Sequence, residues 1–584
     1  MKRTVTHYLI IFLLYSLIAA IFTWPLVTDL SGQIYGYPGD NFGFIYYLWW
    51  WKYSLLNHLN HAFFTLQEAP FGMPILPDSG AVVYYWPTKL LALIFNEGIS
   101  YNLNLLLSFS LSGLFTYILI NHLTRDKRVS FIFGLVFAFS PYHLWRAFNH
   151  LDLAMIQYLP LYFWALIVFL EKKSRSRGFV AGACYSLIYL TNFYYAFFAF
   201  LASLIFAAAY FGQEIFEKRF SQYLTPRYIK ALAAMFSAAI LPFFIFVIPA
   251  VREIDSLKSP WVGDLLKRPA ENLLMFSARP WDYLLPASNH PIFGQLTLKV
   301  YDWLQSRATD WKLRSSFLHE RQLFLGYFSI ILCLLTVYWC IRKRLENRYF
   351  IPFTLTLLLL VFLSAPPYIF IKGVKIVFPS YFLYHFFPMF RSYTRVGVLV
   401  LLFTIMMAAV GYKKILEKCD RLKLGRAIFL LSAALVIFEF LNFPPARVTK
   451  YSEVPPAYQW LAEQSGSFII VEYPKEVNIA EIQMYQRYHL KSFLNFHDLS
   501  PNYKVWDSVK DIYDENTPAN LAKLGVKYAL LHKKPLFEEP NPVDDLWWTR
   551  AYQNPIDYDK IPAGFRLVQK FEKMDILEIT APPI

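Results

Sequence analysis

Two carboxylates lie near the N-terminus of the chain, directly after its first hydrophobic stretch. Asp29 and Asp40 both fall in segment 24–51, and Asp40 follows a Pro-Gly pair that favours a turn. A carboxylate presented beside an apolar pocket is suited to general-base chemistry, because its pKa can be tuned there. Pro-Gly-Asp-Asn is also an ordinary turn sequence, and composition alone favours that simpler interpretation. Asp29 is the weaker candidate, since it lies only one turn past the hydrophobic stretch.

A second set of residues is basic and could hold a phosphate group. Arg391 and Arg395 flank the start of an apolar stretch, and a guanidinium group binds phosphate through two parallel hydrogen bonds. The alternative for this pair is ion pairing with Asp or Glu of the outer domain. Arg146 shares the polar segment PYHLWRAFNHLD with His150 and Asp152. For Arg146, phosphate binding and snorkelling at a membrane interface are equally open interpretations.

Four more polar residues are candidates because they lie at the ends of apolar stretches: Asn192, Tyr194, Glu320 and Arg321. The sequence has no metal-ligand spacing, no Walker loop, no Rossmann fingerprint and no nucleophile elbow. This pattern argues against ATP-driven transport and against chemistry on cytosolic nucleotide sugars. No cofactor or metal site is assigned from the sequence, and the use of a divalent metal ion stays open.

The composition is that of a membrane protein. Of the 584 residues, 56% are hydrophobic and 17% are charged, whereas soluble proteins carry roughly 25% charged residues. The net charge of +15 could suggest nucleic-acid binding. The basic residues instead cluster in short loops between apolar stretches, as the positive-inside rule requires. The four cysteines form no pattern typical of a disulfide framework.

The apolar pattern predicts a mainly helical, polytopic protein with about 11 transmembrane helices, each needing about 20 residues. The predicted spans are 8–24, 101–123, 130–139, 153–170, 179–190, 194–210, 231–251, 323–340, 350–364, 396–412 and 427–441. Five connecting segments carry more Lys and Arg than Asp and Glu, which places them and the N-terminus in the cytoplasm. These segments are 124–128, 171–177, 213–230, 342–348 and 413–426.

The same orientation places the other connections outside the cytoplasmic membrane. The expected transmembrane domain covers 1–442, with outer loops at 25–100, 141–152, 252–322 and 365–395, the last of them partly re-entrant. Stretches 46–59 and 86–95 are expected to be interfacial helices. Segment 443–584 is expected to form a small outer α/β domain, with helices at 454–464 and 480–490, strands at 467–474 and 491–496, a helix and strand within 520–532, and a final hairpin.

The order of several stretches resembles that of the GT-C superfamily of polytopic membrane glycosyltransferases, and within it polyprenyl-phosphate-mannose mannosyltransferases and YfhO-like proteins. The matching stretches are TWPL with PGDNFGFIYYLWW, YNLNLLLSFSLSGLFTYIL, FAFSPYHLWRAFNHLDLA, ERQLFLGYF, FRSYTRVGVLVLL, YQWLAE, VEYP and LGVKYALLH. The resemblance spans nearly the whole chain, and it rests on order and topology rather than on a unique signature.

The resemblance implies an enzyme that takes a sugar from a polyprenyl-phosphate donor on the outer face of the membrane. The acceptor would be a glycan, a lipid or a protein. Asp40 would act as the base or orient the acceptor, and Arg391, Arg395 and Arg146 would hold the donor phosphate. Many members carry an acidic pair in the first outer loop, whereas here Asp40 is followed by Asn41.

Elementary chemistry requires the same set of groups for inverting glycosyl transfer. One carboxylate removes the proton from the acceptor hydroxyl, and positive charge stabilises the leaving phosphate. Two other functions fit a polytopic protein, a lipid or glycan transporter and a non-catalytic scaffold for envelope assembly. Few charged residues lie inside the predicted spans and the sequence has no internal repeat, which counts against a transporter.

Overall fold

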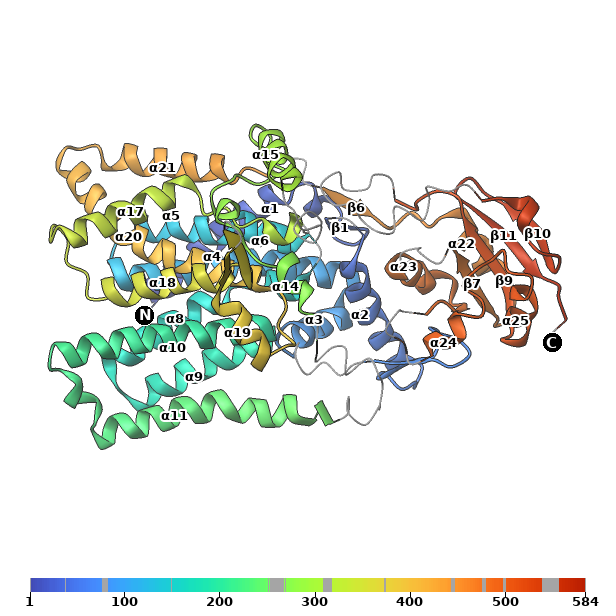
Figure 1. The fold of residues 1–584 in the computed structure, drawn as a ribbon, viewed down its shortest axis with the longest axis horizontal. Coiled ribbons are helices and arrows are strands. Elements are labelled where there is room, and N and C mark those ends of the chain that lie inside the picture. The colour runs from blue at the N-terminus through green and yellow to red at the C-terminus, as the bar shows by residue number, and fades with distance from the viewer. Residues whose placement is uncertain are drawn as a thin grey trace.

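The protein consists of a bundle of long helices and a small sheet domain, joined by short helices and strands (Figure 1). The computed structural model describes residues 2–36, 38–75, 82–148, 150–249, 251–252, 267, 269–307, 318–371, 374–442, 447–474, 479–496, 500, 502–537 and 556–582. Parts of the predicted outer segments, and the predicted domain boundary near 443, lie outside these residues. The division of the chain at 442 therefore stays a prediction.

Each predicted apolar stretch lies mainly in a helix. These helices are α1 (Lys2–Phe22), α4 (Glu97–Thr124), α5 (Lys127–Ala138), α8 (Tyr158–Lys172), α9 (Arg175–Tyr189), α10 (Phe193–Phe216), α11 (Pro226–Pro242), α17 (Tyr327–Ile341), α18 (Phe350–Ser364), α20 (Gly397–Arg421) and α21 (Gly425–Glu439). Within the described residues, 6 helical stretches are long and apolar enough to cross a membrane, and α17 and α18 are shorter apolar helices. The predicted total of eleven spans is not tested by these lengths.

Helix α20 forms the centre of the bundle. Its side chains are buried along almost the whole first half, and it packs against α5, α17, α18 and α21. Close helix packing elsewhere depends on small residues, as is usual between membrane helices. On α9, a Cβ at Gly178 or Gly182 would lie within 2.2 Å of backbone oxygens of α11. These glycines therefore set the distance between α9 and α11.

The five basic segments that the charge pattern places in the cytoplasm gather at one end of the bundle, on the left in Figure 1. Arg128 forms an ion pair with Asp420 at 2.6 Å. Tyr349 donates a hydrogen bond to Glu171 over 2.8 Å, and Arg348 pairs with Glu214 at 3.2 Å. All five segments thus lie on the same side of the bundle. That this side faces the cytoplasm stays a prediction.

The C-terminal domain contains a five-stranded sheet with the strand order β10-β11-β9-β7-β8. Strand β7 is parallel to β8 and β9, and the remaining neighbours are antiparallel. The strands are β7 (Ile469–Tyr473), β8 (Ser492–Phe493), β9 (Val526–His532), β10 (Phe565–Lys570) and β11 (Met574–Ile579), with helices α22 (Pro456–Glu463), α23 (Ile479–His489) and α25 (Thr517–Lys523). The predicted α/β character and the final hairpin are confirmed.

Segments near the N-terminus join the bundle to the sheet domain. Strand β1 (Gln33–Tyr35) pairs antiparallel with β6 (Val448–Lys450), and helix α2 (Asp40–Leu56) packs against α23. Stretches 46–59 and 86–95 lie largely in α2 and α3 (Val82–Ile94), and their expected position at the membrane interface stays a prediction. Segment 365–395 contains the hairpin β4 (Tyr368–Ile371) and β5 (Val374–Val377), followed by the short helix α19 (Pro379–Phe386).

Candidate functional site

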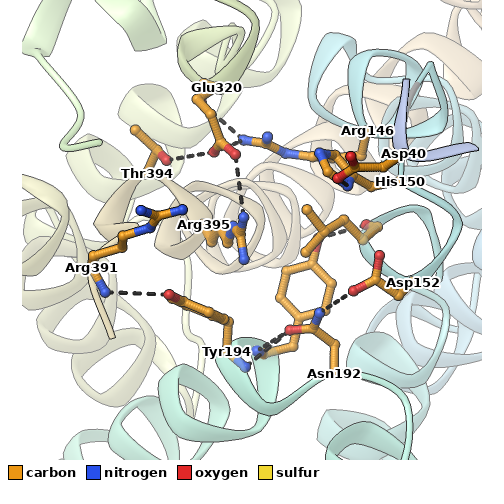
Figure 2. A network of polar contacts seen from close by, with 12 residues as sticks. Asp40, Arg146, His150, Asp152, Asn192, Tyr194, Glu320, Arg391, Thr394 and Arg395 are labelled. Atoms are coloured by element: carbon orange, nitrogen blue, oxygen red, sulfur yellow. Dashed lines mark hydrogen bonds and ion pairs between the residues drawn. The ribbon is translucent and has the colours of Figure 1, made fainter. Parts of the chain in front are cut away.

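Most of the polar candidates lie together at the end of the bundle that faces the sheet domain. They come from the start of α2, the helices α6 (Pro141–Ala147) and α7 (Leu151–Ala154), the start of α10, and the turns η6 (Leu318–Arg321) and η7 (Tyr393–Val396). Figure 2 shows these residues close together in separate groups of contacts: Asp40 with His150, Glu320 with its arginines and Thr394, and Asn192 with Asp152 and the start of α10. Residues distant in sequence are therefore brought into a single polar site.

Asp40 is the first residue of α2 rather than part of a free turn. Its N-cap is Gly39, and its side chain is 68% exposed, with one carboxylate oxygen 3.2 Å from Nδ1 of His150. The buried neighbour Asn41 fixes this position, because its Nδ2 donates to the carbonyl of Phe148 over 3.1 Å and its Oδ1 accepts from the Gly39 N–H over 2.9 Å. The carboxylate is thus anchored through the backbone and open to solvent.

Glu320 is the centre of the basic part of the site. Its two carboxylate oxygens lie 2.7 Å from Arg146 and 3.3 Å from Arg395, and Thr394 donates to it over 3.1 Å. Arg146 also donates to the backbone carbonyl of Glu320 over 2.9 Å. Burial would raise the pKa of Glu320, but Arg146 and then Arg395 outweigh it and hold that pKa well below its ordinary value.

The pairing with Glu320 divides the three arginines into different roles. Arg146 is almost completely buried, and burial opposes its charge while Glu320 raises its pKa above the ordinary value. Its guanidinium is committed to Glu320, so the phosphate contact expected for it would need this pair to open. Arg146 and Arg395 place two positive charges against the one carboxylate of Glu320, and Asp152 is a further carboxylate that acts on Arg395. Arg391 lies on the chain just before η7, on the other side of Arg395 from Arg146 (Figure 2).

Tyr194 connects the two arginines of this turn to α10. The guanidinium of Arg395 lies 4.3 Å from the centre of the Tyr194 ring, a distance typical of a cation–π contact. The hydroxyl of Tyr194 accepts from the backbone N–H of Arg391 over 3.4 Å and donates to the Met389 carbonyl over 3.2 Å. The Arg391 guanidinium, partly exposed, lies 5.1 Å from the Phe276 ring.

Asp152 and Asn192 hold the start of α10 in place. Asn192 caps the helix, because its Oδ1 accepts from the N–H groups of Tyr194 and Tyr195. Its Nδ2 donates to Asp152 over 2.7 Å. Asp152 serves as the carboxylate partner of the capping residue Asn192.

Two sequence candidates lie apart from these groups. Asp29 forms its own turn, accepting from the Ser31 hydroxyl over 2.7 Å and from the backbone of Ser31 and Gly32. The bond from the Ser31 side chain, helped by the backbone bonds, lowers the pKa of Asp29 against a smaller opposing effect of burial. Arg321 makes two hydrogen bonds to the buried Asp282, at 2.9 and 2.8 Å. Both residues therefore have structural partners of their own.

Two residues of the site were not identified from the sequence. Thr394 reaches Glu320, and Asn41 anchors Asp40; each is adjacent in sequence to a residue that was identified. Among the described residues, no three His, Cys, Asp or Glu side chains are grouped so that they could hold a metal ion. Asp40 and His150 form a pair without a third such side chain among the described residues.

No protein-family model matches the chain, and no curated protein matches its sequence. Solved structures do match. The oligosaccharyltransferase of Archaeoglobus fulgidus without ligands is 12% identical, with 90% of this chain and 69% of that chain covered and a TM-score of 0.50. The same enzyme, AglB, with an inhibitory peptide and a dolichol-phosphate is 13% identical over the same shares, with a TM-score of 0.49.

ArnT from Cupriavidus metallidurans, bound to undecaprenyl phosphate, is 10% identical with 98% of each chain covered, and its TM-score is 0.38. At these identities a structural likeness speaks for the fold and not for the substrate. The apolar helices, the small C-terminal sheet domain and the match at a TM-score of 0.50 agree on one architecture. The chain is a multi-pass membrane protein that shares the fold of the Archaeoglobus fulgidus oligosaccharyltransferase, in agreement with the GT-C-like architecture expected from the sequence.

Proposed function

We propose that this protein is a glycosyltransferase that moves a sugar from a polyprenyl-phosphate-linked donor to an acceptor on the outer face of the cytoplasmic membrane. One observation carries the proposal: the open carboxylate Asp40, paired with His150, lies beside the cluster in which Arg146 and Arg395 share Glu320 (Figure 2). The GT-C fold also supports glycosyl transfer, although only by analogy with other proteins of this fold. The acceptor is a glycan, a lipid or a protein.

Asp40 has the role of general base in this proposal. The acceptor hydroxyl loses its proton to the Asp40 carboxylate as its oxygen forms a bond to the anomeric carbon of the sugar. His150, 3.2 Å from the carboxylate, orients Asp40 and leaves its second oxygen for the acceptor. The exposure of Asp40 supports this role, because an acceptor arriving from solution must reach the carboxylate directly.

Arg391 and Arg395 hold the donor phosphate in this proposal. The bond between the anomeric carbon and the phosphate oxygen breaks, and its electron pair stays on the phosphate, where guanidinium groups stabilise the added charge. Glu320 and Tyr194 support this role by fixing Arg395 in orientation. Arg146 positions Glu320 and is a phosphate ligand only if it leaves that carboxylate.

The experiment that tests the proposal separates transfer from transport. The purified protein is placed in liposomes that contain a polyprenyl-phosphate sugar with a labelled sugar and a water-soluble hydroxylated acceptor. The proposal predicts that label appears in the acceptor, with free polyprenyl phosphate released in equal amount. Movement of the intact donor across the bilayer without product would support a transporter. Absence of both reactions over a panel of sugar donors would favour a scaffold.

A further inference from the structure

A large cavity lies at the end of the bundle opposite the candidate site. Its volume is about 870 Å³, and it opens among the segments that connect α8 to α9, α10 to α11 and α17 to α18. A second cavity of about 490 Å³ shares part of its lining, including Glu171, Asn347 and Arg348. Figure 1 shows these connections at the end farthest from the sheet domain. Nothing in the proposed glycosyl transfer uses this region.

Buried Glu214 fixes one wall of the larger cavity. It accepts hydrogen bonds from Arg219 over 2.8 Å, from Arg348 over 3.2 Å and from Gln222 over 2.8 Å. Tyr210 accepts a further bond from Arg348 over 2.5 Å. These contacts hold two guanidinium groups at the rim before any ligand arrives, and preorganised charge lowers the cost of binding.

Two lysines of the lining have no carboxylate partner within the described part of the chain. Lys173 donates to Gln222 over 2.5 Å and lies 4.3 Å from the Tyr223 ring, and Lys343 is exposed at the rim. Across both cavities, cationic side chains outnumber carboxylates. The cations are Lys173, Arg219, Lys343, Arg344, Arg348, Lys413 and Lys414, and the carboxylates are Glu171, Glu217, Glu346 and Glu417. Most of this excess comes from side chains that line only the second cavity. In the larger cavity Arg219 and Arg348 are held by Glu214, so Lys173 and Lys343 are the cations there without a carboxylate partner among the described residues.

Neutral polar atoms without partners also line the larger cavity. The Gln213 Oε1 acceptor and the Asn347 Nδ2 donor are both inaccessible to solvent, and neither has a hydrogen-bond partner among the described residues. Buried polar atoms are normally paired, because an unpaired one costs about 1–3 kcal/mol. A ligand hydroxyl reaches either atom only when the amide group turns toward the cavity, and the unpaired acceptor and donor favour such a turn because it would satisfy them.

We propose that this cavity binds a hydroxylated phosphate ester, with Lys173 and Lys343 contacting the phosphate and Gln213 and Asn347 contacting its hydroxyl groups. Either a lipid headgroup of the phosphoglycerol type or a water-soluble phosphate ester supplies this chemistry. Basic pockets between membrane helices on the cytoplasmic side are suited to anionic headgroups. The site is independent of the glycosyl transfer proposed above.

The test uses the full-length protein and two probes that separate the sources. Glycerol phosphate is titrated into protein in phosphatidylcholine nanodiscs and followed by calorimetry. Phosphatidylglycerol is exchanged against phosphatidylcholine in the nanodisc, and the lipids retained by the protein are counted by native mass spectrometry. Saturable binding of glycerol phosphate supports a soluble ligand, and retention of phosphatidylglycerol alone supports a lipid headgroup.

Matched variants make the result specific to the cavity. Lys173 and Lys343 both have positive φ angles, so each is replaced by asparagine, which tolerates that backbone. The control carries Lys218→Asn and Lys423→Asn, two further lysines with positive φ angles that do not line either cavity. The double variant Lys173→Asn/Lys343→Asn is expected to bind about thirtyfold more weakly, since each lysine near such a phosphate contributes about 1 kcal/mol.

The control double variant is expected to bind like the wild type. Unfolding midpoints of both variants are measured first, so that binding is compared only between folded proteins. Equal affinity of the two double variants, or no saturable binding of either probe to the wild type, would overturn the proposal.

Discussion

At the scale of single residues, the site combines an open carboxylate with a buried one. Asp40 is largely exposed and touches only His150 among the ionisable side chains described at the site. Glu320 is buried and shared by Arg146 and Arg395. The exposed group is suited to proton transfer with a substrate. The buried group is suited to holding cations, because its charge is needed to keep two arginines in place.

The role of Glu320 leads to a prediction about stability. Glu320→Gln leaves Arg146 buried without its carboxylate and is expected to lower the free energy of unfolding by about 3–5 kcal/mol. Thermal unfolding in detergent, measured from pH 7 to pH 3, gives the difference in the free energy of unfolding between the wild type and Glu320→Gln. Glu463→Gln, on the exposed end of α22, is the control and should change the midpoint little.

The difference in the free energy of unfolding between the wild type and Glu320→Gln should also decrease as the pH falls. The folded-state pKa of Glu320 lies below the ordinary value of 4.5. Its stabilisation is therefore complete above about pH 4.5 and is lost as the pH falls toward the folded-state pKa. The gap between wild type and Glu320→Gln should be constant from pH 7 to about 5 and should narrow in more acidic solution. A gap that widens there would contradict the assigned role.

At the scale of elements, the position of Asp40 depends on how β1 approaches α6. Gly36 follows β1 with φ +98°, and a Cβ there would lie 2.1 Å from the Phe148 carbonyl oxygen. That same carbonyl accepts the hydrogen bond from Asn41, the neighbour of Asp40. The β1–β6 ladder and the Tyr46 hydroxyl, which donates to Gln486 of α23 over 2.6 Å, extend this arrangement into the sheet domain.

Gly36→Ala should therefore disturb the site from a distance. The added methyl group must displace the Phe148 carbonyl and also adopts an unfavourable backbone angle, so the expected loss of stability is about 3 kcal/mol or more. Gly466→Ala is the matched control, because Gly466 has φ +81° but open space around its Cβ. Strain alone makes the control cost about 1–2 kcal/mol. Equal unfolding midpoints for the two variants would contradict the close approach described here.

The elements were more predictable from the sequence than their contacts. Apolar length and periodicity depend on neighbouring residues, so the apolar helices and the order of elements around β7 and β9 could be predicted. The Glu320 pairs join residues 174 and 75 positions apart, and the ladder of β1 with β6 joins residues more than 400 apart. Local sequence patterns do not predict contacts between residues so far apart in the chain. The start of α2 at Asp40 was also missed, because Pro38-Gly39 indicates a turn and not a helix cap.

At the scale of the whole molecule, the bundle has two polar ends with different chemistry. One end faces the sheet domain and contains Asp40 with the arginines around Glu320 (Figure 2). The other gathers the basic connecting segments and the large cavity beside Lys173. The apolar helices between them separate the two ends by the length of the bundle (Figure 1). The proposed glycosyl transfer and the proposed binding of a phosphate ester therefore belong to opposite ends of the bundle.

The most direct test of the central claim compares the two N-terminal carboxylates in a transfer assay. Rates are measured with a polyprenyl-phosphate sugar donor for folded Asp40→Asn and Asp29→Asn, two variants with the same chemical change. Loss of a general base is expected to reduce the rate of Asp40→Asn at least about a hundredfold, while Asp29→Asn, whose side chain only closes a turn, retains most activity. An Asp40→Asn protein that transfers sugar at the wild-type rate would contradict the account.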